Sequence, residues 1–520
     1  MNKNTFFDTY TSMASEKPEK VLLRIDDNEL TYGQFMKETA VIGSGMKKLG
    51  INKDDKIGIV MPNSIEWYLV FWSAIRIGVQ PVPIDPQSGS LELSRLIPAT
   101  TIKMCFASEK YRSNNIVNAL KELVPSKFPL QKVVCYMESE EKFESDEFIT
   151  FEKFRNDFCG EECDIYVPED DHIMSLACTS GSTGTPKVLS VPYYGFYQAE
   201  KDISDYLEFG EDDVMMIGMT LYHQGGFGMG LQNTVKGGTV MYQPQFNPVT
   251  FLETVQKYHV NVIQLTATLA KVLLSVPGFE EYDLSSVKVC YFAGEVLPRE
   301  VADIFVNDLN IRVINVIGSS ETATMVVWDS AFDNDTDPSD FRKLPFTDVR
   351  VLGMGDKEVA EGEVGELCIF TDAVITDYFG NPELSAEKII NENGKRWFRT
   401  GDLVRKIENG RVRFAGRSKR IIKRGGNLVH AEEVEAALLT HPKIAAAAVT
   451  AEDHKIIGQQ IVAYVQLAEG VDKMTRGEIA RYFDGKLSAY KLPDKVVVVE
   501  EIPKDIGKIQ FKYLREKAKV

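Results

Sequence analysis

The sequence has no uninterrupted apolar run approaching the roughly 20 residues of a membrane-spanning helix. Residues 1–20 contain no apolar core followed by a small-residue cleavage site, so we expect no secretory signal. Positive charge is also in short supply, with 59 lysines and arginines against 76 aspartates and glutamates and a formal net charge of −17. This imbalance argues against nonspecific binding to nucleic acid, although a local loop can still bind an anion.

Cysteine is sparse and scattered. Two cysteines are four residues apart, but no second pair or nearby histidine completes a metal site. We therefore expect reduced thiols and a cytoplasmic protein. Tandem repeats and low-complexity tracts are absent from the sequence as well. The seven cysteines are Cys105, Cys135, Cys159, Cys163, Cys178, Cys290 and Cys368.

The composition is that of a soluble globular protein, with 44% hydrophobic and 26% charged residues. A chain of 520 residues is too long for one ordinary core, which indicates two or more domains. Strand-like segments at 56–61 and 79–84 flank a helical pattern at 65–77. This alternation predicts an α/β fold with parallel-rich sheets and flanking helices.

The character of the sequence changes near residues 416–426, where basic residues and glycines concentrate. The pattern after this segment is compact and of mixed α+β type. We therefore predict a large N-terminal domain at 1–418 and a small, mobile C-terminal domain at 419–520. Within the small domain we expect helices at 432–439 and 476–487 and strands at 445–449 and 460–465.

The most informative segment is a nine-residue run that follows a strand-like stretch at 173–178. Its glycines allow a close backbone approach, and its hydroxyls and lysine suit a polyphosphate. It is not a Walker A loop, which needs a glycine directly before the lysine. We expect it at the carboxyl end of a strand, as phosphate loops of α/β folds are. The run reads Thr179, Ser180, Gly181, Ser182, Thr183, Gly184, Thr185, Pro186, Lys187.

This run resembles the phosphate-binding signature of the adenylate-forming enzymes. That superfamily includes the acyl-CoA synthetases, the adenylation domains of peptide synthetases and the beetle luciferases. The usual family loop has a glycine after the lysine, where this chain has Val188. The resemblance extends from about Thr31 to Lys512, and further motifs follow in the family's order. It implies binding of ATP and Mg²⁺, with the loop around the β- and γ-phosphates.

A second motif spans residues 315–321 and resembles the family's Asn-x-Tyr-Gly-x-Thr-Glu element. The resemblance implies that Glu321 holds Mg²⁺, Ser320 meets a phosphate and Asn315 contacts the adenine amino group. Ile317 stands where the family usually has an aromatic residue against adenine, which predicts weaker stacking. Ala293, Gly294 and Glu295 match the family loop that passes under adenine.

Two further residues are assigned to the nucleotide. The resemblance implies that Asp402, in the run Trp397 to Asp402, binds both ribose hydroxyls, for which a carboxylate is a natural acceptor. Arg417 carries over as a second contact near ribose and phosphate. Lys419 occupies the family's hinge position between the two domains.

The catalytic lysine of the family's closing motif corresponds to Lys508. The resemblance implies that it reaches the α-phosphate and the carboxylate, where charge builds up. His223 lies in the family's aromatic–histidine element, where it orients the acid, gates its entry or serves a structural role. Gly425 and Gly426 lie where a second domain orientation offers open backbone to a pantetheine arm.

The resemblance therefore implies an AMP-forming acid–thiol ligase, in which an acyl-adenylate passes to the thiol of coenzyme A. Transfer to the phosphopantetheine of a separate carrier protein is the alternative, and Arg420, Lys423 and Arg424 can meet the phosphates of CoA or an acidic carrier. A non-catalytic nucleotide-binding scaffold is the third hypothesis. The pocket segments expected at 222–232 and 264–268 contain no cation, which favours a monocarboxylate, and their glycines leave room for a bulky acyl group. The sequence assigns no oligomeric state.

Overall fold

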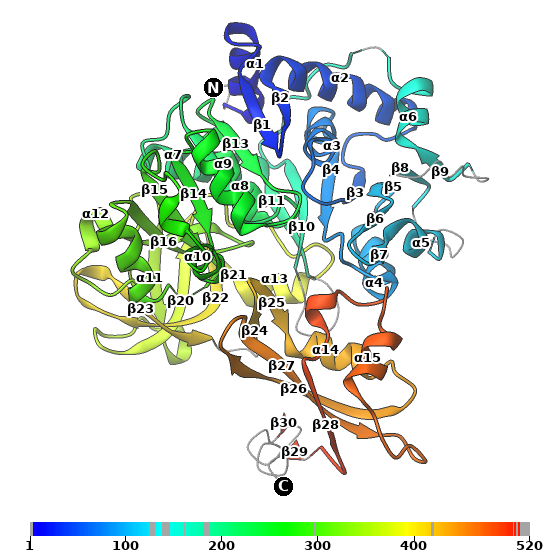
Figure 1. Cartoon of the computed structure of the whole chain (residues 1–520), viewed down its shortest axis with the longest axis vertical. Coiled ribbons are helices and arrows are strands. Elements are labelled where there is room, and N and C mark those ends of the chain that lie inside the picture. The colour runs from blue at the N-terminus through cyan, green and yellow to red at the C-terminus, as the bar shows by residue number, and fades with distance from the viewer. Residues whose placement is uncertain are drawn as a thin grey trace.

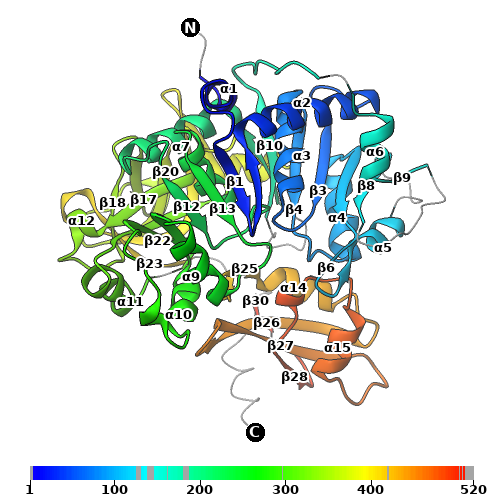
Figure 2. The same cartoon turned by 45° about the horizontal axis from the view of Figure 1, so that its top comes forward.

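A computed structural model gives the fold of the chain. Figure 1 and Figure 2 show a large N-terminal part, coloured from blue to yellow, with a small orange-to-red part against one end of it. The described residues are 4–123, 130–137, 146–160, 162–179, 187–295, 297–417, 421–502, 504–505 and 508–509.

The largest element is a 14-stranded sheet among the described residues. Its parallel half consists of short, nearly continuous apolar strands, as expected for strands that helices cover on both faces. These strands, in spatial order, are β1 (Val21–Ile25), β13 (Thr239–Tyr242), β12 (Val214–Ile217), β14 (Val262–Leu265), β15 (Val289–Ala293) and β16 (Arg312–Ser319).

Antiparallel strands extend this sheet at both ends. Buried and accessible positions alternate along part of this region, for example at residues 364–367. These are β2 (Asn28–Thr31), β17 (Ala323–Asp329), β18 (Asp340–Lys343), β23 (Val412–Arg417), β22 (Lys395–Lys406), β21 (Ile389–Glu392), β20 (Val364–Phe370) and β19 (Asp348–Leu352).

A second, parallel sheet contains the predicted β-α-β unit. The helix between its first two strands, α3 (Ile65–Arg76), is apolar on nearly all sides, and Ser64 caps its start by accepting the amide of Trp67. Trp67 and Trp72 are fully buried between the sheets. The strands, in spatial order, are β4 (Gln80–Ile84), β3 (Lys56–Val60), β5 (Met104–Ser108), β8 (Lys132–Tyr136) and β9 (Phe148–Thr150).

The expected phosphate loop does not follow a strand of either parallel sheet. The strand before it, β10 (Ile173–Thr179), pairs antiparallel with β11 (Lys187–Pro192), and the register places Thr179 opposite Lys187. The loop therefore follows the carboxyl end of a strand, as expected, but that strand belongs to an antiparallel ribbon and not to a parallel sheet. A short second ribbon joins β6 (Lys110–Tyr111) to β7 (Asn114–Asn115).

Helices cover both sheets of the large domain. Capping side chains define several of their starts, for example Thr31 before the second helix and Asn247 before the ninth. The helices are α1 (Phe6–Glu16), α2 (Tyr32–Lys48), α4 (Ser90–Thr100), α5 (Ile116–Lys121), α6 (Phe151–Asp157), α7 (Tyr193–Tyr206), α8 (Gln224–Thr234), α9 (Pro248–Lys257), α10 (Ala267–Leu274), α11 (Arg299–Asp303), α12 (Ser330–Asp333) and α13 (Pro382–Lys388).

The small domain has its own sheet and its own core, which includes Val434, Ile461 and Phe483. Its sheet begins at Ile421, and the predicted division at 418/419 falls among residues 418–420, outside the described residues. Its elements are β24 (Ile421–Arg424), β25 (Asn427–His430), α14 (Ala431–Leu438), β26 (Ile444–His454), β27 (Gly458–Leu467), α15 (Arg476–Tyr482), β28 (Lys495–Val499), β29 (Lys504–Asp505) and β30 (Lys508–Ile509).

The small domain docks on the start of α4. Ser90 donates its amide to the carbonyl of Gly485 at 2.9 Å. A Cβ atom on Gly89 would lie 2.2 Å from the backbone carbonyl carbon of Lys486, so only glycine permits this approach. The α/β architecture with a large and a small domain agrees with the prediction.

Several element boundaries differ from the sequence expectations. The strand expected over 445–449 continues to His454 as β26, and the strand expected over 460–465 is longer at both ends as β27. The helix expected over 476–487 ends at Tyr482, and Phe483 already closes it by donating to Ile479. Asp402 lies inside the long strand β22. No described helix combines the length and the apolar character that crossing a membrane requires.

Candidate functional site

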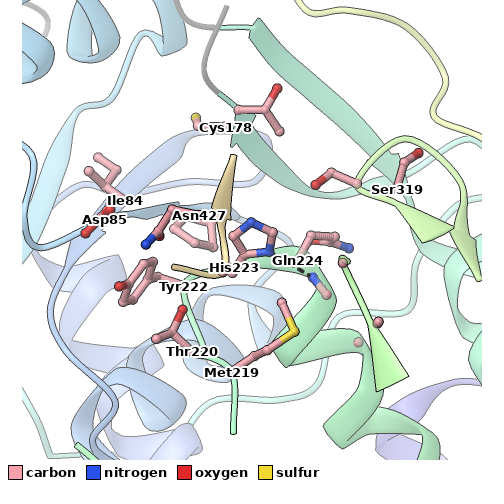
Figure 3. Close-up of a pocket in the computed structure, with 18 of the residues that line it drawn as sticks. Ile84, Asp85, Cys178, Met219, Thr220, Tyr222, His223, Gln224, Ser319 and Asn427 are labelled. Carbon is pink, nitrogen blue, oxygen red and sulfur yellow. Dashed lines mark hydrogen bonds between the residues drawn. The ribbon is translucent and has the colours of Figure 1, made fainter. Parts of the chain in front are cut away.

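A cavity of about 590 Å³ opens where the small domain meets the large one. Its walls come from both domains: the start of α8, the end of β16, the part of β22 around Asp402, and the turn Gly425–Asn427 of the small domain. In Figure 3, Asn427 stands at the same cavity as Tyr222 and His223. A concave site between domains is the usual place for a small-molecule substrate.

One side of the cavity holds a lysine, a tyrosine and a carboxylate. Lys187, at the start of β11, places its Nζ 5.9 Å from the centre of the Tyr378 ring. The Tyr378 hydroxyl donates to Oε1 of Glu321 at 3.1 Å. Burial and the neighbouring Glu321 raise the pKa of Tyr378 far above its ordinary value, so this hydroxyl keeps its proton. The group offers a cation and an oriented carboxylate to a phosphate-bearing ligand.

The loop assigned to the β- and γ-phosphates is described only at its two ends. Thr179 and Lys187 line the cavity. The remaining predicted contacts, Ser180, Gly181, Ser182, Thr183 and Gly184, lie outside the described residues.

The end of β16 and the residues after it bring part of the second motif to the cavity, whereas Asn315 lies behind the cavity lining. Ser320 and Glu321 line it, and the Glu321 amide donates to the Ser319 hydroxyl at 3.2 Å. Asn315 is buried and donates to the carbonyl of Pro338 at 2.9 Å, whereas its Oδ1 has no partner among the described residues. Ile317 packs against the core of the large domain and does not line the cavity.

The residues assigned to ribose and adenine come from two different segments, the strand β22 and the bend after β15. Asp402 is 1% exposed and lines the cavity, and its amide donates to the Thr400 hydroxyl at 3.0 Å. Its strand neighbour across the sheet is Arg417, of which only the backbone is described. Gly294 lines the cavity with φ +85°. Glu295 instead caps α10, accepting from the Thr268 amide at 2.8 Å.

His223 sits at the N-terminus of α8 and points into the cavity (Figure 3). Its Nδ1 accepts from the Gly225 amide at 3.4 Å. The ring is accessible through the cavity yet surrounded by protein, and this desolvation lowers the pKa of the imidazole below its ordinary value. Asn63 holds the preceding turn, because its Oδ1 accepts from the Leu221 amide at 2.7 Å. A neutral His223 can orient a carboxylate through its second ring nitrogen.

The small domain presents glycines to the cavity. Gly425 and Gly426 have φ values of +55° and +83°, which glycine adopts without strain, and both line the cavity. Lys508 is far from this turn: it lies in the β29–β30 hairpin, which Figure 1 shows at the end of the small domain that faces away from the large one. The side chain of Lys508, and the whole of Lys419, lie outside the described residues.

Arg424 does not face a second substrate. Its guanidinium makes two hydrogen bonds to Asp494, at 2.8 and 2.5 Å, and a third to the carbonyl of Tyr490. It therefore stabilises the small domain, and the expectation that it meets CoA phosphates or a carrier is wrong for this domain arrangement. Lys423 lies over the Phe414 ring, with its Nζ 5.6 Å from the ring centre, and Arg420 lies outside the described residues.

Three cavity residues escaped the sequence interpretation. Tyr378 belongs to no motif, and its contact with Glu321 spans 57 residues of chain. Glu200 on α7 reaches the cavity as a buried carboxylate. Lys491 comes from the small domain and has glutamate partners in both domains. The pattern of acidic residues on α7 carries no periodic signal that singles out Glu200.

At its phosphate side the cavity offers a metal ion one carboxylate among the described residues, that of Glu321, and not a complete set of protein ligands. Among the residues that the structure describes, no three histidine, cysteine, aspartate or glutamate side chains gather into a metal site. Glu321, held by Tyr378 at the phosphate side of the cavity, fits the way Mg²⁺ is bound by one or two carboxylates together with substrate phosphates and water.

Comparison with known families identifies the chain. The model of the AMP-binding enzyme family matches residues 11–379, and the model of the AMP-binding enzyme C-terminal domain matches residues 433–507. The chain belongs to the AMP-binding enzyme family. The predicted membership of the adenylate-forming superfamily, in its acyl-CoA ligase branch, is thereby confirmed.

Similar proteins support the same placement. The chain is 26% identical over 544 residues to the mitochondrial medium-chain acyl-CoA ligase ACSF2 of Pongo abelii, covering 99% of this chain and 88% of that protein. The solved structure of o-succinylbenzoate CoA synthetase (MenE) from Bacillus subtilis with a product analogue, OSB-NCoA, superimposes with a TM-score of 0.84 at 20% identity, covering 98% of each chain. The MenE structure with the acyl-adenylate OSB-AMP gives a TM-score of 0.70, also at 20% identity, and covers 99% of each chain.

Proposed function

We propose that this AMP-binding enzyme activates a carboxylic acid with ATP and transfers the acyl group to the thiol of coenzyme A. The products are an acyl-CoA, AMP and pyrophosphate. One observation carries the proposal: a single cavity joins Lys187, Glu321 and Asp402 of the large domain to the glycine turn at Gly425 and Gly426 of the small domain. A nucleotide-binding wall and an entry suited to a narrow thiol arm then face the same acyl group.

In the first step the acid carboxylate attacks the α-phosphorus of ATP, forming an O–P bond while the bond to pyrophosphate breaks. His223 orients the carboxylate, and the loop from Thr179 to Lys187, with Ser180, Gly181, Ser182, Thr183 and Gly184, holds the β- and γ-phosphates. Asp402 accepts the ribose hydroxyls and Asn315 offers its unpartnered Oδ1 to the adenine amino group. Positioning and electrostatics supply the catalysis, because no side-chain nucleophile is required.

Charge at the phosphates is offset by Lys187 and, in the other domain orientation, by Lys508. Glu321 would hold Mg²⁺, which would supply further positive charge to the phosphate oxygens. Ser320 contacts the α-phosphate, and Arg417 contacts the nucleotide near the ribose. Gly294 borders the adenine, whereas Glu295 holds the start of α10 behind it, and Ile317 lies behind the nucleotide wall in place of an aromatic residue.

In the second step the thiolate of CoA attacks the acyl carbonyl, a C–S bond forms, and AMP leaves. The domain arrangement described above fits this step: the glycine turn faces the cavity, and the strand that carries Lys508 points away from it. The higher TM-score with MenE bound to a CoA product analogue, 0.84 against 0.70 for the adenylate complex, supports the same assignment. Rotation about Lys419 exchanges the two arrangements.

A carrier-protein phosphopantetheine is the alternative acceptor, since its thiol arm has the same chemistry as that of CoA. The deciding experiment measures pyrophosphate release from Mg·ATP across a panel of monocarboxylic acids, with and without CoA. Acid-dependent release that rises strongly with CoA supports the ligase. Acid-dependent pyrophosphate release that does not change when CoA is added supports a carrier protein as the acceptor. ATP binding without release for any acid would contradict both and favour a nucleotide-binding scaffold.

A further inference from the structure

The wall of the cavity contains a buried carboxylate that the proposed chemistry does not use. Glu200 projects from α7, is 2% exposed and lines the cavity together with Phe196 of the same helix. Helix α7 packs against α8 and β17, so Glu200 lies between the helix that begins at His223 and the sheet. A carboxylate in such a place costs free energy unless a partner offsets it.

The protein satisfies this carboxylate only in part. Gln232 on α8 donates its Nε2 to Oε2 of Glu200 at 2.8 Å, and this is the one hydrogen bond that Glu200 makes among the described side chains. No lysine or arginine in the described part of the chain forms an ion pair with it. Gln232 is itself 1% exposed and lines the cavity, and its Oε1 has no partner in the structure. Oε1 of Glu200 and Oε1 of Gln232 can therefore each accept a further hydrogen bond beside the cavity.

Helix α8 leaves room for this carboxylate. A Cβ atom on Gly228 would lie 2.6 Å from Oε1 of Glu200, so any side chain at this position would displace the carboxylate. Gly228 also lines the cavity, which places Oε1 at its surface rather than behind it. On the sheet side, Thr324 lines the cavity and shares a hydrogen bond of 3.1 Å with the Tyr291 hydroxyl. Glu200, Gln232 and Thr324 thus form a polar patch of the cavity wall, in which Thr324 is the cross-strand neighbour of Gly318 in the second motif.

The helix also sets the distance between the patch and the reacting carboxylate. Gly228 and Gln232 follow His223 by five and nine residues, which correspond to about 7.5 and 13.5 Å along an α-helix. An extended chain advances about 1.2 Å per bond, so a group near the patch is roughly 6–11 bonds from the acid carbon. An acyl chain of six to ten carbons reaches it.

We propose that Glu200, with Gln232, selects acids whose chain carries a hydrogen-bond donor, a hydroxyl or an amino group, near its far end. This inference rests on the proposed function and adds the substrate class to it. A donor would complete the hydrogen bonding of both oxygens, whereas a purely apolar chain would leave the carboxylate desolvated and unpaired. Burial raises the pKa of Glu200 to about 7. A hydrogen-bond donor in the substrate would favour the ionised carboxylate, because it stabilises the charged form.

The test compares kcat/KM for ω-hydroxy and ω-amino acids of six, eight and ten carbons with the unsubstituted acid of equal length, measured as pyrophosphate release in the presence of CoA. The wild-type enzyme is expected to prefer at least one donor-bearing acid by about 10-fold or more. The hydroxy and amino arms show which donor the site accepts. Turnover of the unsubstituted acids tests the proposed function separately.

Two variants assign the preference to this patch. Glu200→Met removes the acceptor at similar volume and is expected to reverse the preference in favour of the unsubstituted acid. Gly228→Ala keeps the carboxylate but pushes it aside, and is expected to reduce the preference. Glu253→Gln, at an exposed glutamate on α9, is the matched control and should leave the ranking unchanged.

A wild-type preference for the unsubstituted acid at every length would overturn the inference while leaving the ligase function intact. A donor preference that survives Glu200→Met unchanged would overturn it as well. Absence of pyrophosphate release with every acid would overturn the proposed function and, with it, the inference.

Discussion

Nζ of Lys491 in the small domain lies 2.6 Å from Oε1 of Glu92 in the large domain and 2.8 Å from Oε1 of Glu433 in its own domain. Only 8% of the Lys491 side chain is exposed. Burial alone would lower the pKa of Lys491, but the two glutamates raise it well above its ordinary value, so the ammonium stays charged. Glu92 also accepts from the Ser488 amide at 2.8 Å and from the Gly89 amide at the start of α4. One carboxylate thus caps a helix and fixes the domain arrangement.

Lys491→Met should weaken this arrangement, because it leaves two carboxylates buried without their cation, at a cost of about 3–5 kcal/mol. We expect transfer of a supplied acyl-adenylate to CoA to fall at least about 10-fold, with adenylate formation much less affected. Lys473→Met, at an exposed lysine, is the control. Equal losses in both half-reactions would show that the contact supports the fold rather than one domain arrangement.

Lys508→Ala should remove adenylate formation while leaving thioesterification of a supplied acyl-adenylate nearly intact. The reason is that its strand points away from the cavity when the glycine turn faces it. The measurement is pyrophosphate release in one assay and acyl-CoA formation in the other. Lys473→Ala serves as the control, and comparable loss in both assays would contradict the role given to Lys508.

Lys419→Pro should trap the enzyme in one domain arrangement, because proline fixes φ near −65° and a hinge must change its backbone angles. One half-reaction should persist while the full conversion to acyl-CoA falls by at least about 10-fold. Lys419→Ala removes the side chain but leaves φ free, and should behave as wild type. Unchanged acyl-CoA formation in the proline variant would place the hinge elsewhere.

Tyr378→Phe should raise the Mg²⁺ and ATP concentrations needed for half-maximal adenylation. The variant loses the 3.1 Å hydrogen bond that orients Glu321, and a bond to a charged group contributes about 1.5–3 kcal/mol. A decrease of roughly 10-fold in kcat/KM for Mg·ATP is expected. Tyr194→Phe loses a comparable bond, to the carbonyl of Pro168, away from the cavity and should have no such effect. An unchanged Mg²⁺ dependence would separate Glu321 from the metal.

Glu200→Gln should change how stability depends on pH. The folded-state pKa of Glu200, about 7, exceeds its ordinary value of 4.5, so between these pH values the folded protein holds more protons than the unfolded chain. The free energy of unfolding of the wild type therefore decreases as pH rises from 4.5 to 7, by about 3 kcal/mol from this group. From pH 5 to pH 8 the denaturation midpoint of the variant should therefore rise relative to that of the wild type. A difference in midpoint that does not depend on pH would refute the shift. Glu253→Gln should show no such trend.

Much of the fold was predictable because its signals are local. The strand expected at 56–61 and the helix expected at 65–77 appear as β3 and α3, each within one residue of the predicted ends. These segments are buried on all sides, so their apolar runs are dense and short turns bound them. The phosphate loop was harder to place, because the apolar strand β10 looks the same whether its partner is parallel or antiparallel.

The site residues also fall into two groups, those that local motifs predict and those that they do not. Lys187, Glu321, Asp402 and Gly426 lie in short motifs whose chemistry can be recognised in isolation, and all four line one cavity. Glu200 could not be found by that route, since a glutamate on an amphipathic helix normally faces water.

The sequence by itself determined the family, the order of the motifs and the segments that become strands and helices, since each depends on residues close together along the chain. Tertiary structure alone decided which carboxylates are buried and which part of the small domain faces the cavity. Lys491 and Glu92 are 399 residues apart, and their pairing exists only after both domains have folded and docked. Burial and ion pairing depend on the surroundings in space, where neighbours along the chain carry little information.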